Sequence, residues 1–248
     1  MNTIKAVFFD LDNTLIAFDE DEFVKFYLKG LSEWMSPLGY DPNELVQAIL
    51  FSLKRMAANR GPETNEQIFW KAMGEKLGQW VIADISAFEA YYENDYRKLA
   101  SLISVMDGNA QVVQTASKIG PIILATNPFF PATATCQRAS WGKIDPKWFD
   151  WITTYDNSRS SKPDASYFLA LCEQFSLKPE EVLMVGNDLS MDWAARNAGL
   201  QFFTVTDRLM NEEGYPYLDH PHGNLRDLNR YLEDHLNRME KAGELCRK

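Results

Sequence analysis

Two carboxylates follow the first apolar run of the sequence and are separated by one residue. The run at residues 6–9 (AVFF) ends at Asp10, and Asp12 comes two positions later. Such a run is typical of a parallel strand that is covered on both faces. Two carboxylates that point into one crevice repel each other, so the pair indicates a bound cation or a reaction that uses both acids. A polar turn that opens the next helix is the alternative interpretation.

A hydroxyl and a cation follow later in the chain. Residues 122–127 (IILATN) predict a strand that ends in Thr126, whose hydroxyl can donate a hydrogen bond to an anionic oxygen. Lys162 stands directly before Pro163, a residue that can begin a helix. A fixed cation near the amino end of a helix favours phosphate. A helix cap for Thr126 and a solvated surface position for Lys162 are the alternatives.

Further acids follow the strand that we predict at residues 181–185. The turn contains Asn187 and Asp188, and Asp192 comes four residues later. A helix cap and an exposed helix acid are the alternative roles for the two aspartates. Ligands of a doubly wound sheet bind outside the carboxyl ends of its strands. We therefore expect these acids, the hydroxyl and the lysine to meet at one edge of a sheet.

Apolar runs alternate with helical patterns along most of the chain, which predicts an α/β fold with a doubly wound parallel sheet. The segment 17–104 has no comparable strand and contains amphipathic, aromatic-rich stretches with helix starts at Asp41 and Thr64. We expect a core domain from residues 1–16 and 105–248 and a smaller helical cap domain from residues 17–104. The predicted strands are residues 4–9, 121–125, 181–185 and 201–205, and the predicted helices of the core include 109–118, 164–174, 189–198 and a final one within 225–248.

The overall composition describes a globular, acidic chain. It has 248 residues, 46% of them hydrophobic, which is enough for a packed core. A formal charge of −10 opposes binding to nucleic acid or to an anionic membrane. The three cysteines, Cys136, Cys172 and Cys246, form no C-x-x-C pair and favour a reducing compartment. No apolar run approaches the ~20 residues of a membrane span, and we expect a cytoplasmic protein.

These residues, in this order, resemble the haloacid dehalogenase superfamily over nearly the whole chain. The first motif of that family, D-x-D-x-T, is matched by residues 10–14 (DLDNT) and is the specific one. The second is matched by Thr126, the third by Lys162-Pro163 and the fourth by residues 186–192 (GNDLSMD). The family often inserts a helical cap between its first and second motifs, as we predict here. One departure is that Asn187, and not an aspartate, directly follows the glycine of the fourth motif.

The resemblance implies a phosphatase that acts on a small phosphorylated metabolite through an aspartyl-phosphate. Asp10 would be the nucleophile, and Asp12 would protonate the leaving group and then deprotonate the attacking water. Thr126, together with backbone amides near Leu11 and Asp12 and with the side chain of Asn127, would hold the phosphoryl oxygens. Lys162 would supply a positive charge beside them.

Magnesium is the cofactor that the resemblance implies, and the charge of three aspartates around a phosphate dianion also requires a divalent cation. By resemblance, the ion would take a carboxylate oxygen of Asp10 and the backbone carbonyl of Asp12. We favour Asp188 as the further ligand because a hard dication prefers an anionic oxygen. Asp192 would then act indirectly or through water, although Asn187 or Asp192 can also fill the main position.

Substrate selection is expected to reside in the cap. Arg60, in a polar loop between two cap helices, is a candidate to bind a second anionic group of the substrate, and an exposed linker is equally consistent with this loop. Asp12 argues against a dehalogenase, because no alkoxide needs a proton in that reaction. A phosphomutase, a phosphonate hydrolase with a cap lysine, and a non-catalytic protein that binds a phosphate ligand are the other functions compatible with the motifs.

Overall fold

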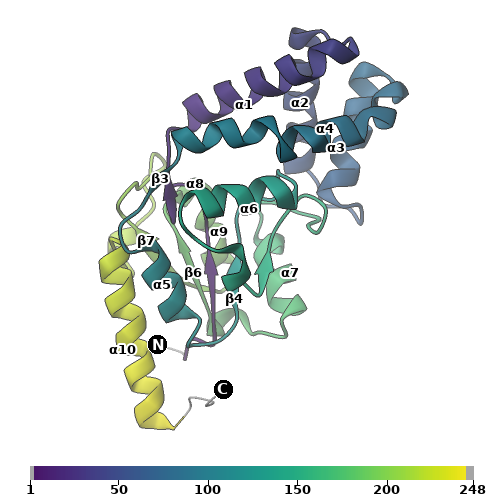
Figure 1. The fold of residues 1–248 in the computed structure, drawn as a ribbon. Coiled ribbons are helices and arrows are strands. Elements are labelled where there is room, and N and C mark those ends of the chain that lie inside the picture. Colours follow the sequence, from purple (N-terminus) through teal and green to yellow (C-terminus); the bar gives the residue numbers. More distant parts are fainter. Residues whose placement is uncertain (1–2, 244–248) are drawn as a thin grey trace.

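The computed structural model describes residues 3–243 and contains a parallel sheet with helices on both faces (Figure 1). Its strands are β1 (Ala6–Phe9), β4 (Ile122–Leu124), β5 (Trp151–Ile152), β6 (Val182–Gly186), β7 (Gln201–Val205) and β8 (His222–Gly223). The strand order is β5-β4-β1-β6-β7-β8, and every neighbouring pair is parallel. This arrangement confirms the predicted doubly wound α/β fold.

Alternate side chains of β1 enter two separate cores. Val7 and Phe9 pack in a core that includes residues of α5 (Asn109–Ala116) and α10 (Leu225–Ala242). Phe8 packs on the other face of the sheet with residues of α7 (Ala165–Gln174), α8 (Leu189–Asp192) and α9 (Ala194–Asn197). A strand that is covered on both faces needs an apolar residue at every position, which explains the continuous apolar run.

The two edge strands of the sheet are absent from the sequence-based prediction. β5 and β8 have only two residues each. A strand of this length shows no period in its hydrophobic pattern, so only its pairing with a neighbour defines it. The four predicted strands are the inner ones, β4, β1, β6 and β7.

The insertion between β1 and β4 is helical, as predicted, and lies beyond the carboxyl ends of the strands (Figure 1). The Asp41 side chain accepts hydrogen bonds from the first backbone N–H groups of its helix, and Thr64 forms a capping box with Gln67. These caps fix the two helix starts that the sequence predicts. The cap comprises α1 (Glu20–Met35), α2 (Pro42–Ala57), α3 (Asn65–Leu77) and α4 (Ile85–Glu93), with 3-10 helices at η1 (Ser36–Leu38), η2 (Gln79–Asp84) and η3 (Asp95–Leu102).

A two-stranded antiparallel ribbon closes the insertion. β2 (Ile16–Ala17) pairs with β3 (Ser104–Val105). We propose that this ribbon is the boundary between the core domain (1–16 and 105–248) and the cap domain (17–104).

The cap also contacts the core at the start of α3. The backbone N–H of Asn65 donates to the carbonyl of Ser158 at 2.8 Å. Its buried side-chain amide donates to the carbonyls of Pro128 at 3.3 Å and Ser160 at 3.2 Å. Asn65 therefore joins the cap to the loop that follows β4 and to the loop that precedes α7.

No helix within residues 3–243 combines the length and the apolar character needed to cross a membrane. Cys136 and Cys172 are free thiols. Cys246 and the end of the segment 225–248 lie outside the described residues.

Candidate active site

Asp10 stands at the carboxyl end of the central strand, β1. Its backbone N–H donates to the carbonyl of Val185 at 2.9 Å, and the carbonyl of Phe9 accepts from Ala125 at 2.7 Å. Both neighbouring strands therefore fix the backbone up to Asp10, whose side chain borders a cavity of about 220 Å³. The predicted site residues that line this cavity are Asp10, Asp12, Thr126, Asn127, Lys162, Asp188 and Asp192.

A tight turn brings Asp10 and Asp12 to the same cavity. The carbonyl of Leu11 accepts the backbone N–H groups of residues 14–16, and the Leu11 side chain is fully buried in the core. Asn13 has a φ of 57°, in the left-handed region that asparagine tolerates better than most residues. The alternation of acids with the buried Leu11 thus directs both carboxylates to one side of the turn.

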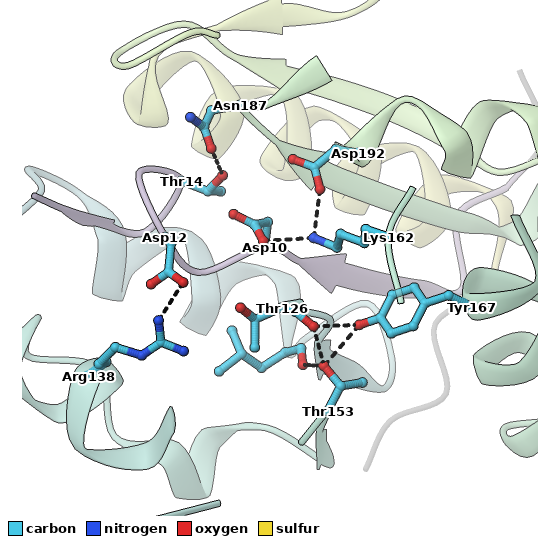
Figure 2. Close-up of polar contacts among 11 residues, drawn as sticks. Asp10, Asp12, Thr14, Thr126, Arg138, Thr153, Lys162, Tyr167, Asn187 and Asp192 are labelled. Atoms are coloured by element: carbon cyan, nitrogen blue, oxygen red, sulfur yellow. Dashed lines mark hydrogen bonds and ion pairs between the residues drawn. The ribbon is translucent and has the colours of Figure 1, made fainter. Parts of the chain in front are cut away.

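Lys162 is buried between two carboxylates (Figure 2). Its Nζ donates to Asp10 Oδ1 at 2.7 Å and to Asp192 Oδ1 at 2.6 Å. Burial lowers the pKa of Lys162, but the two carboxylates outweigh burial and hold this pKa above its ordinary value. Burial raises the pKa of Asp192. Lys162 is therefore a fixed charge of the site and not a solvated surface lysine.

Thr126 and Asn127 lie on the loop after β4. The carbonyl of Thr126 accepts from the hydroxyls of Thr153 at 2.7 Å and Tyr167 at 2.8 Å, which fixes the backbone of this loop (Figure 2). Asn127 Oδ1 is buried and has no hydrogen-bond partner among residues 3–243. Both side chains line the cavity, so a hydroxyl and an amide are available to a ligand there.

Asp12 takes part in an ion pair that the sequence motifs do not reveal. Nη1 of Arg138, on α6 (Ala132–Trp141), donates to Asp12 Oδ2 at 2.6 Å (Figure 2). Burial raises the pKa of Asp12 to about 6, although Arg138 opposes this shift. One signal in the sequence could have identified Arg138: it shares the buried face of α6 with Ala134 and Ala139. An arginine on such a face requires a partner.

The three candidates of the fourth motif have different surroundings. Asn187 is fully buried, and both ends of its amide are occupied: Oδ1 accepts from the Thr14 hydroxyl at 2.7 Å and Nδ2 donates to the Arg208 carbonyl at 2.8 Å. Asp188 lines the cavity and also caps α8 with Oδ1. Asp192 lines the cavity as well and is almost completely buried. The two aspartates, and not Asn187, therefore present oxygens to the cavity.

Carboxylate oxygens of aspartates border the cavity, where a divalent cation would need them. Within residues 3–243, no three His, Cys, Asp or Glu side chains form a ready metal site. Magnesium needs less, because it binds through one or two carboxylates together with water and substrate phosphate. Asp10 and Asp188 line one cavity, and Asp192 Oδ2 is buried without a partner in the described chain. Gly186 leaves the space for this last carboxylate, since a Cβ there would overlap it. This donor set fits magnesium.

The cap supplies a different wall. Glu20 Oε1 accepts a hydrogen bond from Asn13 Nδ2 at 2.9 Å, and burial raises the pKa of Glu20. Among the described residues that line the cavity, the cations are Lys162 and Arg138, and both belong to the core. The cap-side residues are Phe18, Glu20, Phe23 and Val24.

Arg60 lies apart from the other predicted site residues. It is not among the residues that line the cavity, and its Nε forms an ion pair with Asp164. Asp164 is also the N-cap of α7, which begins at Ala165, so Pro163 precedes the helix and does not begin it. The structure therefore does not bring Arg60 to the cavity, because an acid distant in the sequence holds it at the surface.

Comparison with known proteins identifies the family. Residues 4–199 match the model of the haloacid dehalogenase-like hydrolases. The match extends over most of the chain, and the chain belongs to this family of hydrolases.

Two relatives of this chain are named as phosphatases. The chain is 28% identical over 207 residues to a phosphoglycolate phosphatase of Nitrosospira multiformis, which covers 82% of this chain and 83% of the relative. It is 26% identical over 212 residues to a glyceraldehyde 3-phosphate phosphatase of Pyrococcus furiosus, with 81% and 80% covered.

Solved structures share the fold. A 2-haloacid dehalogenase from Pseudomonas syringae superposes with a TM-score of 0.61 at 17% identity, over 95% of this chain and 99% of that chain. A phosphatase of the same family from Thermococcus onnurineus gives a TM-score of 0.56 at 18% identity, over 92% and 98%. Because proteins named for different reactions share this fold, the fold alone does not define the reaction.

Proposed function

We propose that this hydrolase is a magnesium-dependent phosphatase that acts on a small phosphorylated metabolite through an aspartyl-phosphate. The observation that carries the proposal is the convergence of Asp10, Asp12, Thr126 and Lys162 on one cavity at the carboxyl ends of the strands. The phosphatase names of the two relatives support it. The free thiols of Cys136 and Cys172 support a reducing, cytoplasmic setting.

In the first step, a carboxylate oxygen of Asp10 attacks phosphorus and the bond from phosphorus to the ester oxygen breaks. Asp12 gives its proton to the departing oxygen, so that an alcohol leaves and an aspartyl-phosphate remains. Lys162 balances the charge of Asp10, while Thr126 and Asn127 donate to the phosphoryl oxygens together with backbone amides near Leu11. The fixed positions of these donors favour the transition state over the free ester.

In the second step, Asp12 takes a proton from water, which attacks phosphorus and releases phosphate from Asp10. One carboxyl group must therefore be an acid first and a base afterwards. A pKa of about 6 allows both states near neutral pH, because neither form is strongly disfavoured there.

Magnesium would be held by the carboxylate of Asp10, the backbone carbonyl of Asp12 and the carboxylate of Asp188. When bound, the ion neutralises charge on the phosphoryl oxygens. Asp192 would act indirectly, because it accepts a hydrogen bond from Lys162 and so helps to hold this lysine beside Asp10.

The cap offers no support for a phosphonate hydrolase. That reaction needs a cap lysine in the site, and among the described residues that line the cavity Lys162 is the only lysine. Measurement of phosphate release during turnover distinguishes the proposed phosphatase from a phosphomutase and from a non-catalytic binding protein.

The test is release of inorganic phosphate from an aryl phosphate and from a panel that includes 2-phosphoglycolate and glyceraldehyde 3-phosphate. We expect release with magnesium, none with chelator, and none from Asp10→Asn. A folded native protein that releases no phosphate from any member of the panel, or an Asp10→Asn variant as active as the native protein, would overturn the proposal.

A further inference from the structure

Arg138 is a buried cation whose charge has one polar partner among the described residues. It is 2% exposed, and its Nη1 donates to Asp12 Oδ2 at 2.6 Å. Its Nε and Nη2 are buried and have no hydrogen-bond partner within residues 3–243. Arg138 therefore lines the cavity with Asp12 as the one polar partner of its charge in the described chain.

Aromatic residues from both domains surround this guanidinium. It lies over the ring of Phe130, with 4.6 Å from Cζ to the ring centroid. Tyr27 on α1 and Tyr96 on η3 belong to the cap, and the charge of Arg138 lowers the pKa of both phenols against the larger effect of burial. Tyr27 also packs edge-on against Phe130 at 5.3 Å. These aromatic residues thus shield the guanidinium of Arg138 from water, whereas the side chain of Asp12 stays 26% exposed toward the cavity. A salt bridge is stronger where water is excluded on one side.

A contribution to fold stability is a poor explanation for this pair. Burying two charges costs about as much as their attraction returns, and an apolar pair of similar volume is often at least as stable. The neighbours of Arg138 on the buried face of α6 are Ala134, Thr135 and Ala139, so an apolar side chain would suit this face. The pair does, however, fix the direction of the Asp12 carboxylate.

We propose that Arg138 is a positioning residue for Asp12, which it holds at the leaving-group side of the cavity, and that the cap aromatics complete this arrangement. The inference rests on the proposed phosphatase function. In the first step, the proton moves from Asp12 to the ester oxygen as the bond to phosphorus breaks. Arg138 takes no part in the bond changes and acts only on where Asp12 lies. Misplacement of an acid by about 1 Å is enough to lose much of its contribution.

The dependence on leaving group distinguishes positioning from a general structural role. An aryl oxide leaves as a stable anion and needs no proton, whereas an alkoxide does. The quantity to compare is kcat/KM, because it covers the steps up to release of the alcohol and excludes hydrolysis of the aspartyl-phosphate. The variants are Arg138→Met, which keeps the length of the side chain, and Arg138→Lys, which keeps the charge with a single donor group.

For Arg138→Met we expect kcat/KM to fall roughly 10- to 100-fold with alkyl phosphates and less than about 3-fold with an aryl phosphate. The larger loss is at or below the lower end of what a general acid contributes, because Asp12 is misplaced and not removed. Arg138→Lys should lie between this variant and the native enzyme. Inhibition by inorganic phosphate should change little in both variants, because the phosphoryl oxygens are held elsewhere. Arg226→Met is the matched control, since Arg226 pairs with Asp107 at the surface.

Equal losses for aryl and alkyl phosphates, or no loss, would overturn the positioning role. A loss confined to substrates that carry a second anionic group would also overturn it and make Arg138 a substrate-binding residue. If Arg138→Met does not fold, the same comparison is made with Arg138→Lys. An inactive native protein, or an active Asp10→Asn variant, would overturn the proposed function and this inference together, whereas the outcomes above leave the function standing.

Discussion

The two walls of the cavity are built from different chemistry. The core wall carries fixed charges. Lys162 donates hydrogen bonds to Asp10 and Asp192, and Arg138 donates one to Asp12. The cap wall consists of Phe18, Phe23 and Val24 together with one acid, Glu20. We therefore propose that the core wall acts on the phosphoryl group and that the cap wall selects what is attached to it.

The difference follows from how each wall is held. Asp10 follows β1, which hydrogen bonds to neighbouring strands on both sides, so the sheet fixes its position. Ion pairs then hold Lys162 against Asp10 and Asp192, and Arg138 against Asp12. The cap residues come from α1 and the segment before it, which reach the core through the β2–β3 ribbon. Reaction and selection are thus assigned to separate parts of the chain, and each assignment can be tested.

The largest expected effect concerns the buried lysine of the core wall. Lys162→Met leaves Asp10 and Asp192 as buried like charges, and we expect the free energy of unfolding to fall by about 3–5 kcal/mol. Urea unfolding at neutral pH measures this change. Lys5→Met is the control, because Lys5 pairs with Glu181 at an exposed site, where the expected change is below about 1 kcal/mol. A similar small change in both variants would show that the core wall is not the fixed element described here.

A smaller effect concerns Asp12 and pH. Its pKa is raised from 3.8 to about 6, so the folded protein binds this proton more tightly than the unfolded chain does. The resulting stabilisation is complete below pH ~4 and is lost as the pH rises through ~6, a change on the order of 2–3 kcal/mol. Native protein and Asp12→Asn are compared by urea unfolding in chelator across this range. The native protein should lose stability relative to the variant as the pH rises. If the free energies of unfolding of the two proteins changed in parallel with pH, the raised pKa of Asp12 would be contradicted.

The cap wall is tested by Glu20→Gln. Removal of a negative charge that faces the cavity should lower KM for dianionic phosphate esters several-fold and change kcat less, because repulsion between like charges near the surface is worth ~1 kcal/mol. The matched control is Glu33→Gln on the same helix, whose carboxyl group is exposed. Steady-state kinetics at low ionic strength measure both variants. A larger effect on kcat than on KM would place Glu20 with the reacting groups and remove the contrast between the walls.

The smallest effect is expected at Arg60. Arg60→Gln breaks an ion pair with Asp164 whose arginine side chain is 46% exposed, and such pairs contribute about 0–1 kcal/mol. KM for substrates with a second anionic group should stay at the native value, because Arg60 lies outside the cavity. A raised KM confined to those substrates would return Arg60 to the substrate site.

The groups that follow strands could be predicted from the sequence. Asp10 and Thr126 follow buried apolar runs, and parallel topology brings the ends of such runs to one edge of the sheet. The helical cap domain was predictable from local sequence signals, because Asp41 and Thr64 are N-cap residues that mark the starts of its helices.

Contacts between distant segments could not be predicted in this way. Arg138 lies 126 residues from its partner Asp12, and the sequence of α6 does not identify that partner. The ion pair of Arg60 with Asp164 was not predictable for the same reason, since Asp164 lies in another domain of the proposed division. A cation, buried or exposed, finds a distant partner only through the packed structure, and no periodic pattern in the sequence identifies that partner.

The measurement that tests the account most directly is chemical trapping of the proposed intermediate at Asp10. The native enzyme is quenched during turnover of its best substrate, and borohydride then reduces any acyl phosphate to an alcohol. Peptide mass spectrometry should find the reduced residue at Asp10, within residues 6–16, and should find no such product in Asp10→Asn. Turnover without a reduced residue at Asp10, or trapping at a different acid, would contradict the assignment of Asp10 as the nucleophile.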